Sequence, residues 1–126
     1  MPIHKGQCHC SAVQFSFTAP SIVDVTVCDC SICNMTGYQH VFIPQKDLKF
    51  ITGEDHLELY TFNTGAAKHL FCKTCGIKPL YIPRSHPDCY SVNLRCVTPA
   101  TLDVGKHIPF SGSNWEQNIE DLKRET

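Results

Sequence analysis

The chain has 126 residues, a length that fits a single domain covering residues 1–126. Its 11 lysines and arginines nearly balance its 12 acidic residues, giving a formal net charge of −1. That balance gives no reason to expect a nucleic acid or an anionic membrane as partner. The sequence has neither an apolar run long enough to span a bilayer nor the apolar segment of a signal peptide, so we expect a cytoplasmic protein.

Short segments of alternating apolar and polar residues predict a series of strands. Clusters of Gly, Pro, Asn, Asp and Ser, typical of turns, separate several of these segments. The predicted strands cover residues 13–17, 23–28, 38–44, 57–62, 69–72, 77–82 and 90–96.

Only two segments are candidates for helix. One is a single turn at Ser31–Thr36, and the other covers residues 114–123 near the end of the chain. The sequence therefore predicts a mainly β domain of antiparallel sheets with little helix.

Nine cysteines dominate the chemistry of the chain. In a reducing compartment, such a number points to a metal rather than to disulfides, and an odd count fits a closed disulfide framework poorly. Seven of the nine fall into three clusters at metal-ligand spacing. The clusters are Cys8-His9-Cys10, Cys28-Asp29-Cys30-Ser31-Ile32-Cys33 and Cys72-Lys73-Thr74-Cys75-Gly76.

The spacing inside each cluster allows its thiolates to converge on one ion. In a Cys-x-Cys pair on an extended segment, both side chains point to the same side. A Cys-x-x-Cys pair followed by glycine is typical of a zinc knuckle, because Gly76 lets the backbone curl around the two sulfurs. His9, between two cysteines, is expected to point away from the ion.

Thiolate-only sites select zinc or iron–sulfur clusters. Seven thiolates divide naturally into a closed set of four, which is structural, and a set of three, which leaves a position for water or substrate. Spacing does not say which clusters combine. Cys8 and Cys10 could join Cys72 and Cys75, or Cys30 and Cys33 could do so, and bridged or iron–sulfur arrangements stay open.

Two interpretations without a metal fit the sequence less well. Redox-active Cys-x-x-Cys pairs are typical of a βαβ pattern, which the sequence lacks. Inert buried cysteines occur singly, whereas this chain has three clusters.

The three cysteine motifs resemble, in order and spacing, those of the glutathione-dependent formaldehyde-activating enzyme family, which includes centromere protein V. The similarity spans nearly the whole chain, and residues 60–64, 83–85 and 114–116 look closest to the centromere-protein-V-like branch. One departure is the segment at residues 34–38, where many members carry basic and small residues. The matching motifs are Gly6-Gln7-Cys8-His9-Cys10, Cys28-Asp29-Cys30-Ser31-Ile32-Cys33 and Phe71-Cys72-Lys73-Thr74-Cys75-Gly76.

The resemblance implies an Mss4-like, or β-tent, fold that binds two Zn²⁺ per chain. It assigns a structural zinc to Cys8, Cys10, Cys72 and Cys75, and an open, catalytic zinc to Cys28, Cys30 and Cys33. The implied activity is that of a carbon–sulfur lyase, which forms or breaks the adduct of a thiol such as glutathione with an aldehyde such as formaldehyde.

The main alternative to an enzyme is a non-catalytic, zinc-stabilised binding or scaffold module. A thiol-based redox or metal-storage device is a third interpretation. An enzyme acting on glutathione needs cations for its two carboxylates, and the candidates are Lys46, Lys68, Arg84, Arg95 and His40. The oligomeric state does not follow from the sequence.

Overall fold

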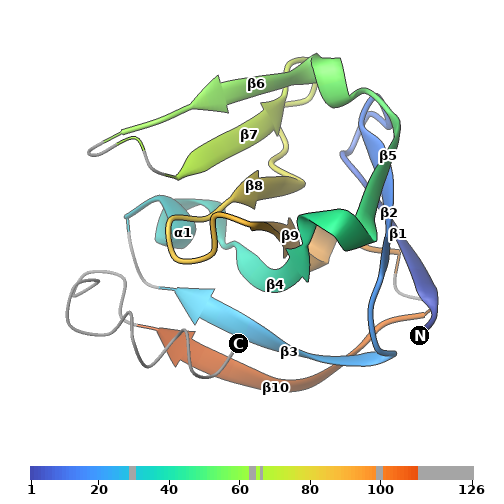
Figure 1. Ribbon diagram of the computed structural model, residues 1–126. Coiled ribbons are helices and arrows are strands. Elements are labelled where there is room, and N and C mark those ends of the chain that lie inside the picture. The colour runs from blue at the N-terminus through green and yellow to red at the C-terminus, as the bar shows by residue number, and fades with distance from the viewer. Residues whose placement is uncertain (29–30, 63–64, 66, 99–100, 111–126) are drawn as a thin grey trace.

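The computed structural model describes residues 1–28, 31–62, 65, 67–98 and 101–110. Ten strands and one short helix form the described part of the fold (Figure 1). The strands are β1 (Ile3–Gln7), β2 (Gln14–Thr18), β3 (Ile22–Cys28), β4 (Gln39–Pro44), β5 (Leu48–Thr52), β6 (Leu57–Tyr60), β7 (Lys68–Cys72), β8 (Leu80–Ile82), β9 (Cys89–Asn93) and β10 (Asp103–Phe110). The helix is α1 (Ser31–Thr36), and three 3₁₀ turns are η1 (Gln45–Asp47), η2 (Glu54–His56) and η3 (Leu94–Cys96).

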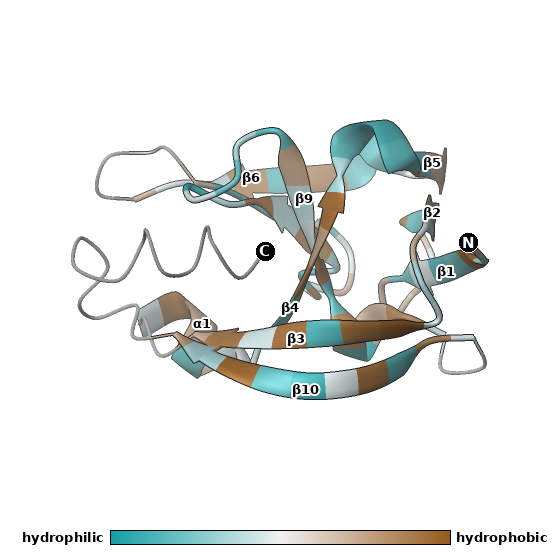
Figure 2. Ribbon diagram, turned by 60° about the horizontal axis from the view of Figure 1, so that its bottom comes forward, coloured by the Kyte–Doolittle hydropathy of each residue, from teal (hydrophilic) through white to brown (hydrophobic). Residues whose placement is uncertain are grey.

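The strands form two sheets. The smaller sheet has the order β1-β2-β5, and the larger has the order β10-β3-β4-β9-β8-β7-β6. In Figure 1 the small sheet stands along one side of the molecule, and the large sheet runs from β10 at the bottom to β6 at the top. All pairs are antiparallel except β10 with β3, which run side by side in the same direction (Figure 2).

The core lies where the inward faces of the two sheets meet. In β2 the burial alternates residue by residue, which places Phe15 and Phe17 inside. Val41 and Ile43 on β4, with Val92 on β9, belong to the same buried cluster. Because burying a side chain of this size contributes about 1.5–3 kcal/mol, this cluster holds the small sheet against the large one.

The structure confirms the mainly β fold class and the single-turn helix Ser31–Thr36. The helix expected over residues 114–123 lies outside the described residues. Three strands were not expected, namely β1, β5 and β10. The inward positions of β1 are His4 and Gly6, neither of which marks a strand by hydropathy, and most of β10 is exposed.

Three expected strands are shorter than the pattern suggests. The segment 57–62 is strand only over Leu57–Tyr60, and the segment 77–82 only over Leu80–Ile82. The segment 90–96 ends as a strand at Asn93, where the side-chain oxygen accepts a hydrogen bond from the Arg95 backbone N–H at 3.1 Å and starts η3. A local side-chain bond here competes with the strand ladder.

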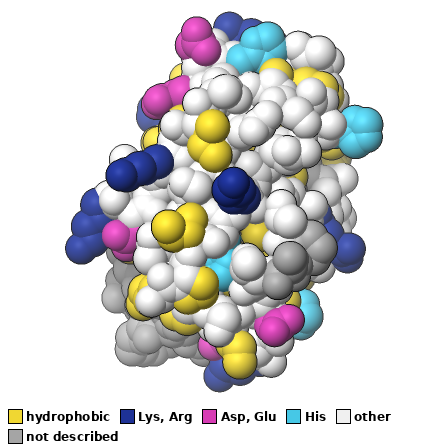
Figure 3. All heavy atoms as spheres, turned by 90° about the vertical axis from the view of Figure 1, so that its right-hand side faces the viewer, with side chains coloured by type: hydrophobic (Ala, Val, Ile, Leu, Met, Phe, Trp, Pro, Cys, Tyr) yellow, Lys and Arg dark blue, Asp and Glu magenta, His cyan; other side chains and the backbone are white. Residues whose placement is uncertain are grey.

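The surface of the small-sheet side carries charges of both signs among apolar side chains (Figure 3). In the described part of the chain, no helix is long and apolar enough to cross a membrane.

Candidate metal centre

Four thiols from two distant parts of the chain meet at one place in the structure. Cys8 and Cys10 follow β1, whereas Cys72 ends β7 and Cys75 comes three residues later. Their sulfur atoms all lie within 4.8 Å of one another. The group therefore links the connection between β1 and β2, in the small sheet, to the end of β7, in the large sheet.

The spacing of the sulfurs fits a tetrahedral metal ion. The Sγ atoms of Cys8 and Cys10 are 3.7 Å apart, and those of Cys10 and Cys72 are 3.6 Å apart. A tetrahedron with zinc–sulfur bonds of about 2.3 Å has sulfur–sulfur edges of about 3.8 Å. The four residues can thus hold a metal ion of the size and geometry of zinc.

Backbone amides stabilise thiolates in this group. The amide N–H groups of Val13 and Thr74 donate to the sulfurs of Cys8 and Cys72, each at 3.4 Å. Desolvation raises the pKa of Cys75, but hydrogen bonds from the amides of Ile77 and Cys10 outweigh it and lower that pKa to about 6. At Cys10, a hydrogen bond from the Ala12 amide lowers the pKa, but desolvation and the neighbouring sulfurs outweigh it and raise that pKa to about 11. Thiolates are the form that binds a metal, so the amides favour metal binding at Cys75.

The local backbone of the first pair differs from the expectation. Cys8 and Cys10 were expected on an extended segment, but β1 ends at Gln7 and the pair lies in a turn. Ser11, next in the chain, has φ +67°, and the turn closes with a bond from the Ser11 amide to the Cys8 carbonyl. The sulfurs converge through this turn. The second pair follows the knuckle expectation, since Gly76 has φ +75°.

The middle cysteine cluster lies elsewhere, where β3 ends at Cys28 and α1 carries Cys33. Cys30 is outside the described residues. Among the described residues, the group of four is the one set of three or more possible ligands that lies close together, and it includes neither Cys28 nor Cys33. The metal-binding roles of Cys28, Cys30 and Cys33 stay predictions.

Polar side chains surround the buried thiol of Cys33. The Nε2 atom of His40 on β4 lies 3.3 Å from the Cys33 Sγ. The other ring nitrogen, Nδ1, lies 2.9 Å from the Ser91 hydroxyl and 3.2 Å from the Tyr81 hydroxyl. Tyr38, buried in the same cluster, donates its hydroxyl proton to the backbone carbonyl of Ser91. All five side chains are at least nine-tenths buried.

A buried lysine completes this cluster, and the sequence did not single it out. The Lys78 Nζ lies 2.7 Å from the His69 Nδ1 and 3.9 Å from the centre of the Tyr81 ring. The signal available was a lone lysine inside the otherwise apolar segment 77–82. Burial of a lysine costs free energy unless partners compensate, and here a ring face and an imidazole do so.

The cations expected to bind carboxylates are mostly at the surface. Lys46, Lys68 and Arg95 are exposed, and Arg84 is half-buried. His40 is buried instead, at 3% exposure, with its ring nitrogens directed at Cys33 and Ser91. The structure therefore gives His40 a role within the Cys33 cluster rather than at the surface.

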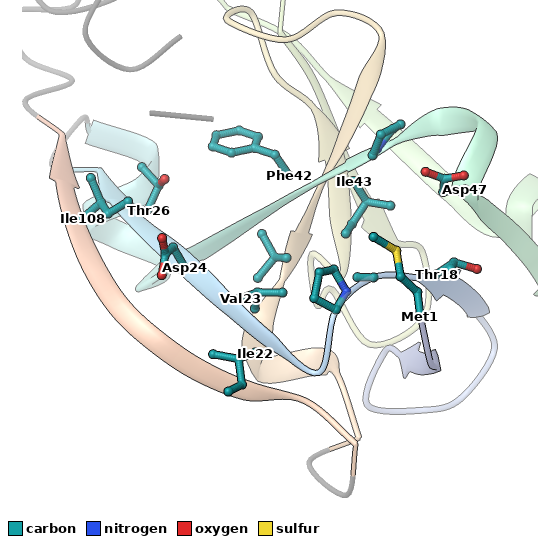
Figure 4. Close-up of a pocket in the computed structure, with 14 residues that line it drawn as sticks. Met1, Thr18, Ile22, Val23, Asp24, Thr26, Phe42, Ile43, Asp47 and Ile108 are labelled. Carbon is teal, nitrogen blue, oxygen red and sulfur yellow. The ribbon is translucent and has the colours of Figure 1, made fainter. Parts of the chain in front are cut away.

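A groove of about 400 Å³ runs along β3 and β4 (Figure 4). Its lining is mainly apolar and includes Thr26 and Phe42, and Phe42 packs with Cys28 against Phe110. Its charged side chains are Asp24 and Asp47, and no lysine, arginine or histidine stands among its described lining residues. Cys28 and Cys33 themselves are not among the described lining residues of the groove.

Comparison with known proteins identifies the family of this chain. The family model described as glutathione-dependent formaldehyde-activating enzyme matches residues 3–115. The chain belongs to this family. Its β fold is accordingly the Mss4-like fold of the family, as the cysteine motifs implied.

A solved structure supports the same conclusion. The crystal structure of a Rhodobacter sphaeroides protein is similar to this chain, with a TM-score of 0.67 and 35% sequence identity. The match covers 79% of this chain and 98% of that protein.

Proposed function

We propose that the protein is a zinc-dependent carbon–sulfur lyase of the glutathione-dependent formaldehyde-activating type. Its reaction would form or break a thiol–aldehyde adduct such as S-hydroxymethylglutathione. In the forward direction a carbon–sulfur bond forms between the thiol sulfur and the aldehyde carbon, and the thiol proton ends on the aldehyde oxygen. The reverse reaction breaks that bond and returns the proton to sulfur.

The observation that carries this proposal is the family match over residues 3–115. The arrangement of the cysteines supports it. Four of the seven clustered thiols already form one compact group, which is the donor set of a closed, structural site. We therefore assign a structural zinc to Cys8, Cys10, Cys72 and Cys75, and a second zinc to Cys28, Cys30 and Cys33.

Three protein thiolates leave one position of a tetrahedral zinc site available to a substrate. Zinc bound there would hold the substrate sulfur as a thiolate at neutral pH. The chain itself supplies the surroundings: Cys33 is held in a buried polar cluster, and Cys28 packs against Phe110, which also contacts Phe42 of the groove along β3 and β4. A thiol that entered along this groove would meet the carboxylates of Asp24 and Asp47, which favour a thiol with fewer carboxylates than glutathione.

The test is an assay of adduct formation and breakdown with the protein loaded with two zinc ions per chain. Formaldehyde would be paired with glutathione, with cysteamine, which carries an amine, and with the uncharged 2-mercaptoethanol. Because thiols add to formaldehyde spontaneously, a reaction without protein is the baseline. The control is the Cys28→Ser variant, which loses one of the three proposed ligands.

We expect the zinc-loaded protein to exceed the baseline with at least one thiol, and the Cys28→Ser variant to match the baseline. Rates at the baseline for all thiols, with two zinc ions still bound, would favour the non-catalytic binding module instead.

A further inference from the structure

The contact between His40 and Cys33 lies at the set of three cysteines to which the proposed function assigns the open zinc. The His40 Nε2 and the Cys33 Sγ are 3.3 Å apart, and both side chains are buried. An imidazole at this distance can act in two ways. Its lone pair can bind the same metal as the sulfur, or its N–H can donate to the thiolate.

The hydrogen bond between Ser91 and His40 distinguishes these two roles. The Ser91 side chain is fully buried, at 0% exposure, and within the described part of the chain its hydroxyl makes one hydrogen bond, to the His40 Nδ1 at 2.9 Å. A buried hydroxyl proton without an acceptor costs about 1–3 kcal/mol. The Ser91 hydroxyl therefore donates to Nδ1, which must be the unprotonated nitrogen. The proton of the neutral ring then lies on Nε2, the atom that faces Cys33.

Tyr81 also approaches the Nδ1 atom of His40. Its hydroxyl lies 3.2 Å from Nδ1, and the Lys78 Nζ lies 3.9 Å from its ring centre. A cation over the ring face withdraws electron density and makes the phenol a stronger donor. The lone pair of an unprotonated Nδ1 can accept from either hydroxyl, so the Tyr81 contact is compatible with a proton on Nε2.

We propose that His40 is a positioning residue that donates its Nε2–H to the Cys33 thiolate and does not bind the metal. A zinc ion held by Cys28, Cys30 and Cys33 would then keep a position for a substrate thiol. The hydrogen bond also draws charge from the Cys33 sulfur, which strengthens the attraction between the zinc and an incoming thiolate.

Nitrogen NMR of the wild-type protein, labelled with ¹⁵N and loaded with ¹¹³Cd²⁺ in place of zinc, reads this arrangement directly. We expect the His40 ring to show a proton on Nε2, an unprotonated Nδ1 and no direct ¹¹³Cd–¹⁵N coupling. A proton on Nδ1, or a direct coupling of Nε2 to ¹¹³Cd, would overturn the proposal. The measurement needs neither a variant nor turnover, so the proposed activity can fail while this result stands.

A matched pair of variants tests the consequence. His40→Gln keeps an amide N–H near Cys33, whereas His40→Phe keeps a ring without a donor. We expect the ¹¹³Cd resonance of the three-cysteine site to shift in His40→Phe and to stay near the wild-type value in His40→Gln. The resonance of the four-cysteine site is the internal control for folding.

In the assay, we expect His40→Phe to raise KM for the thiol about tenfold, and His40→Gln to keep KM within a few-fold of the wild-type value. Equal shifts in the two variants, or none in either, would contradict a donor role.

Discussion

Cys89 lies outside the three cysteine clusters, half-buried at the start of β9, with its Sγ 3.7 Å from the Asp88 carboxylate. Burial, followed by the charge and hydrogen bond of Asp88, raises the pKa of the Cys89 thiol from 9.0 to about 11. The protonated thiol is thus favoured by folding. Its contribution to stability is complete below pH 9 and is lost as the pH rises through 11.

This shift predicts the reactivity of Cys89. At pH 8 a thiol with a pKa near 11 is about one-thousandth thiolate, so iodoacetamide should modify it slowly. Removing the nearby charge in Asp88→Asn should lower the pKa and speed modification several-fold. Mass spectrometry of peptides from the zinc-loaded protein measures the rate, and Asp103→Asn, an exposed position on β10, is the control. Equal rates in both variants would show that Asp88 does not act on this thiol.

At the residue scale, spacing alone identified the seven clustered cysteines, because metal ligands repeat at short, fixed intervals. It could not identify the surroundings of Cys33. His40 meets Ser91 across 51 residues of sequence, and Tyr81 meets His40 across 41. Such contacts depend on which strands become neighbours, and Lys78 was missed for the same reason.

At the scale of elements, Gly53 lies between β5 and η2. Here the chain leaves the small sheet, whose last strand is β5, and enters the large sheet at β6. The φ of Gly53 is +80°, and a Cβ there would lie 2.0 Å from the Ala12 carbonyl oxygen. Ala12 belongs to the connection that follows Cys10. A side chain at position 53 would therefore push against the backbone that carries the first two thiols.

We expect Gly53→Ala to lower the free energy of unfolding by about 3 kcal/mol or more, from backbone strain and overpacking together. Gly37→Ala is the matched control. Gly37 also has a positive φ, +65°, but a Cβ there would meet nothing within 4 Å, so strain alone should cost about 1 kcal/mol. Urea unfolding of the zinc-loaded proteins gives both values. Similar losses in the two variants would mean that contact with Ala12 has no part in the effect.

Among the strands that the sequence predicted correctly, β2 shows the expected alternation, with one buried side. β1 escaped detection because His4 and Gly6 are its inward residues, and Gly6 leaves room for the Phe15 ring, 2.5 Å from where a Cβ would stand. β10 is an edge strand with little buried surface, so its sequence carries no clear alternation. Pairing rather than hydropathy makes these two segments strands.

At the scale of the whole molecule, the four-cysteine group joins the two sheets. Cys8 and Cys10 belong to the connection within the small sheet, whereas Cys72 ends a strand of the large sheet and Cys75 follows it. Structural zinc contributes about 10–16 kcal/mol of apparent binding free energy in small zinc domains, against a net stability of about 5–15 kcal/mol for a typical domain. Loss of this one site should therefore unfold the protein.

The two proposed zinc sites should differ sharply in this respect. We expect Cys72→Ser to lose one zinc, the cooperative thermal transition and the amide protection of β1, β2 and β7. Cys28→Ser should also lose one zinc, yet keep most of its amide protection, because Cys28 ends a strand that its neighbours β4 and β10 hold by backbone hydrogen bonds. Metal analysis, thermal unfolding and hydrogen exchange of the two variants make the comparison. If both changes unfold the protein to the same degree, the second ion is as structural as the first, and the division between a closed and an open site is wrong.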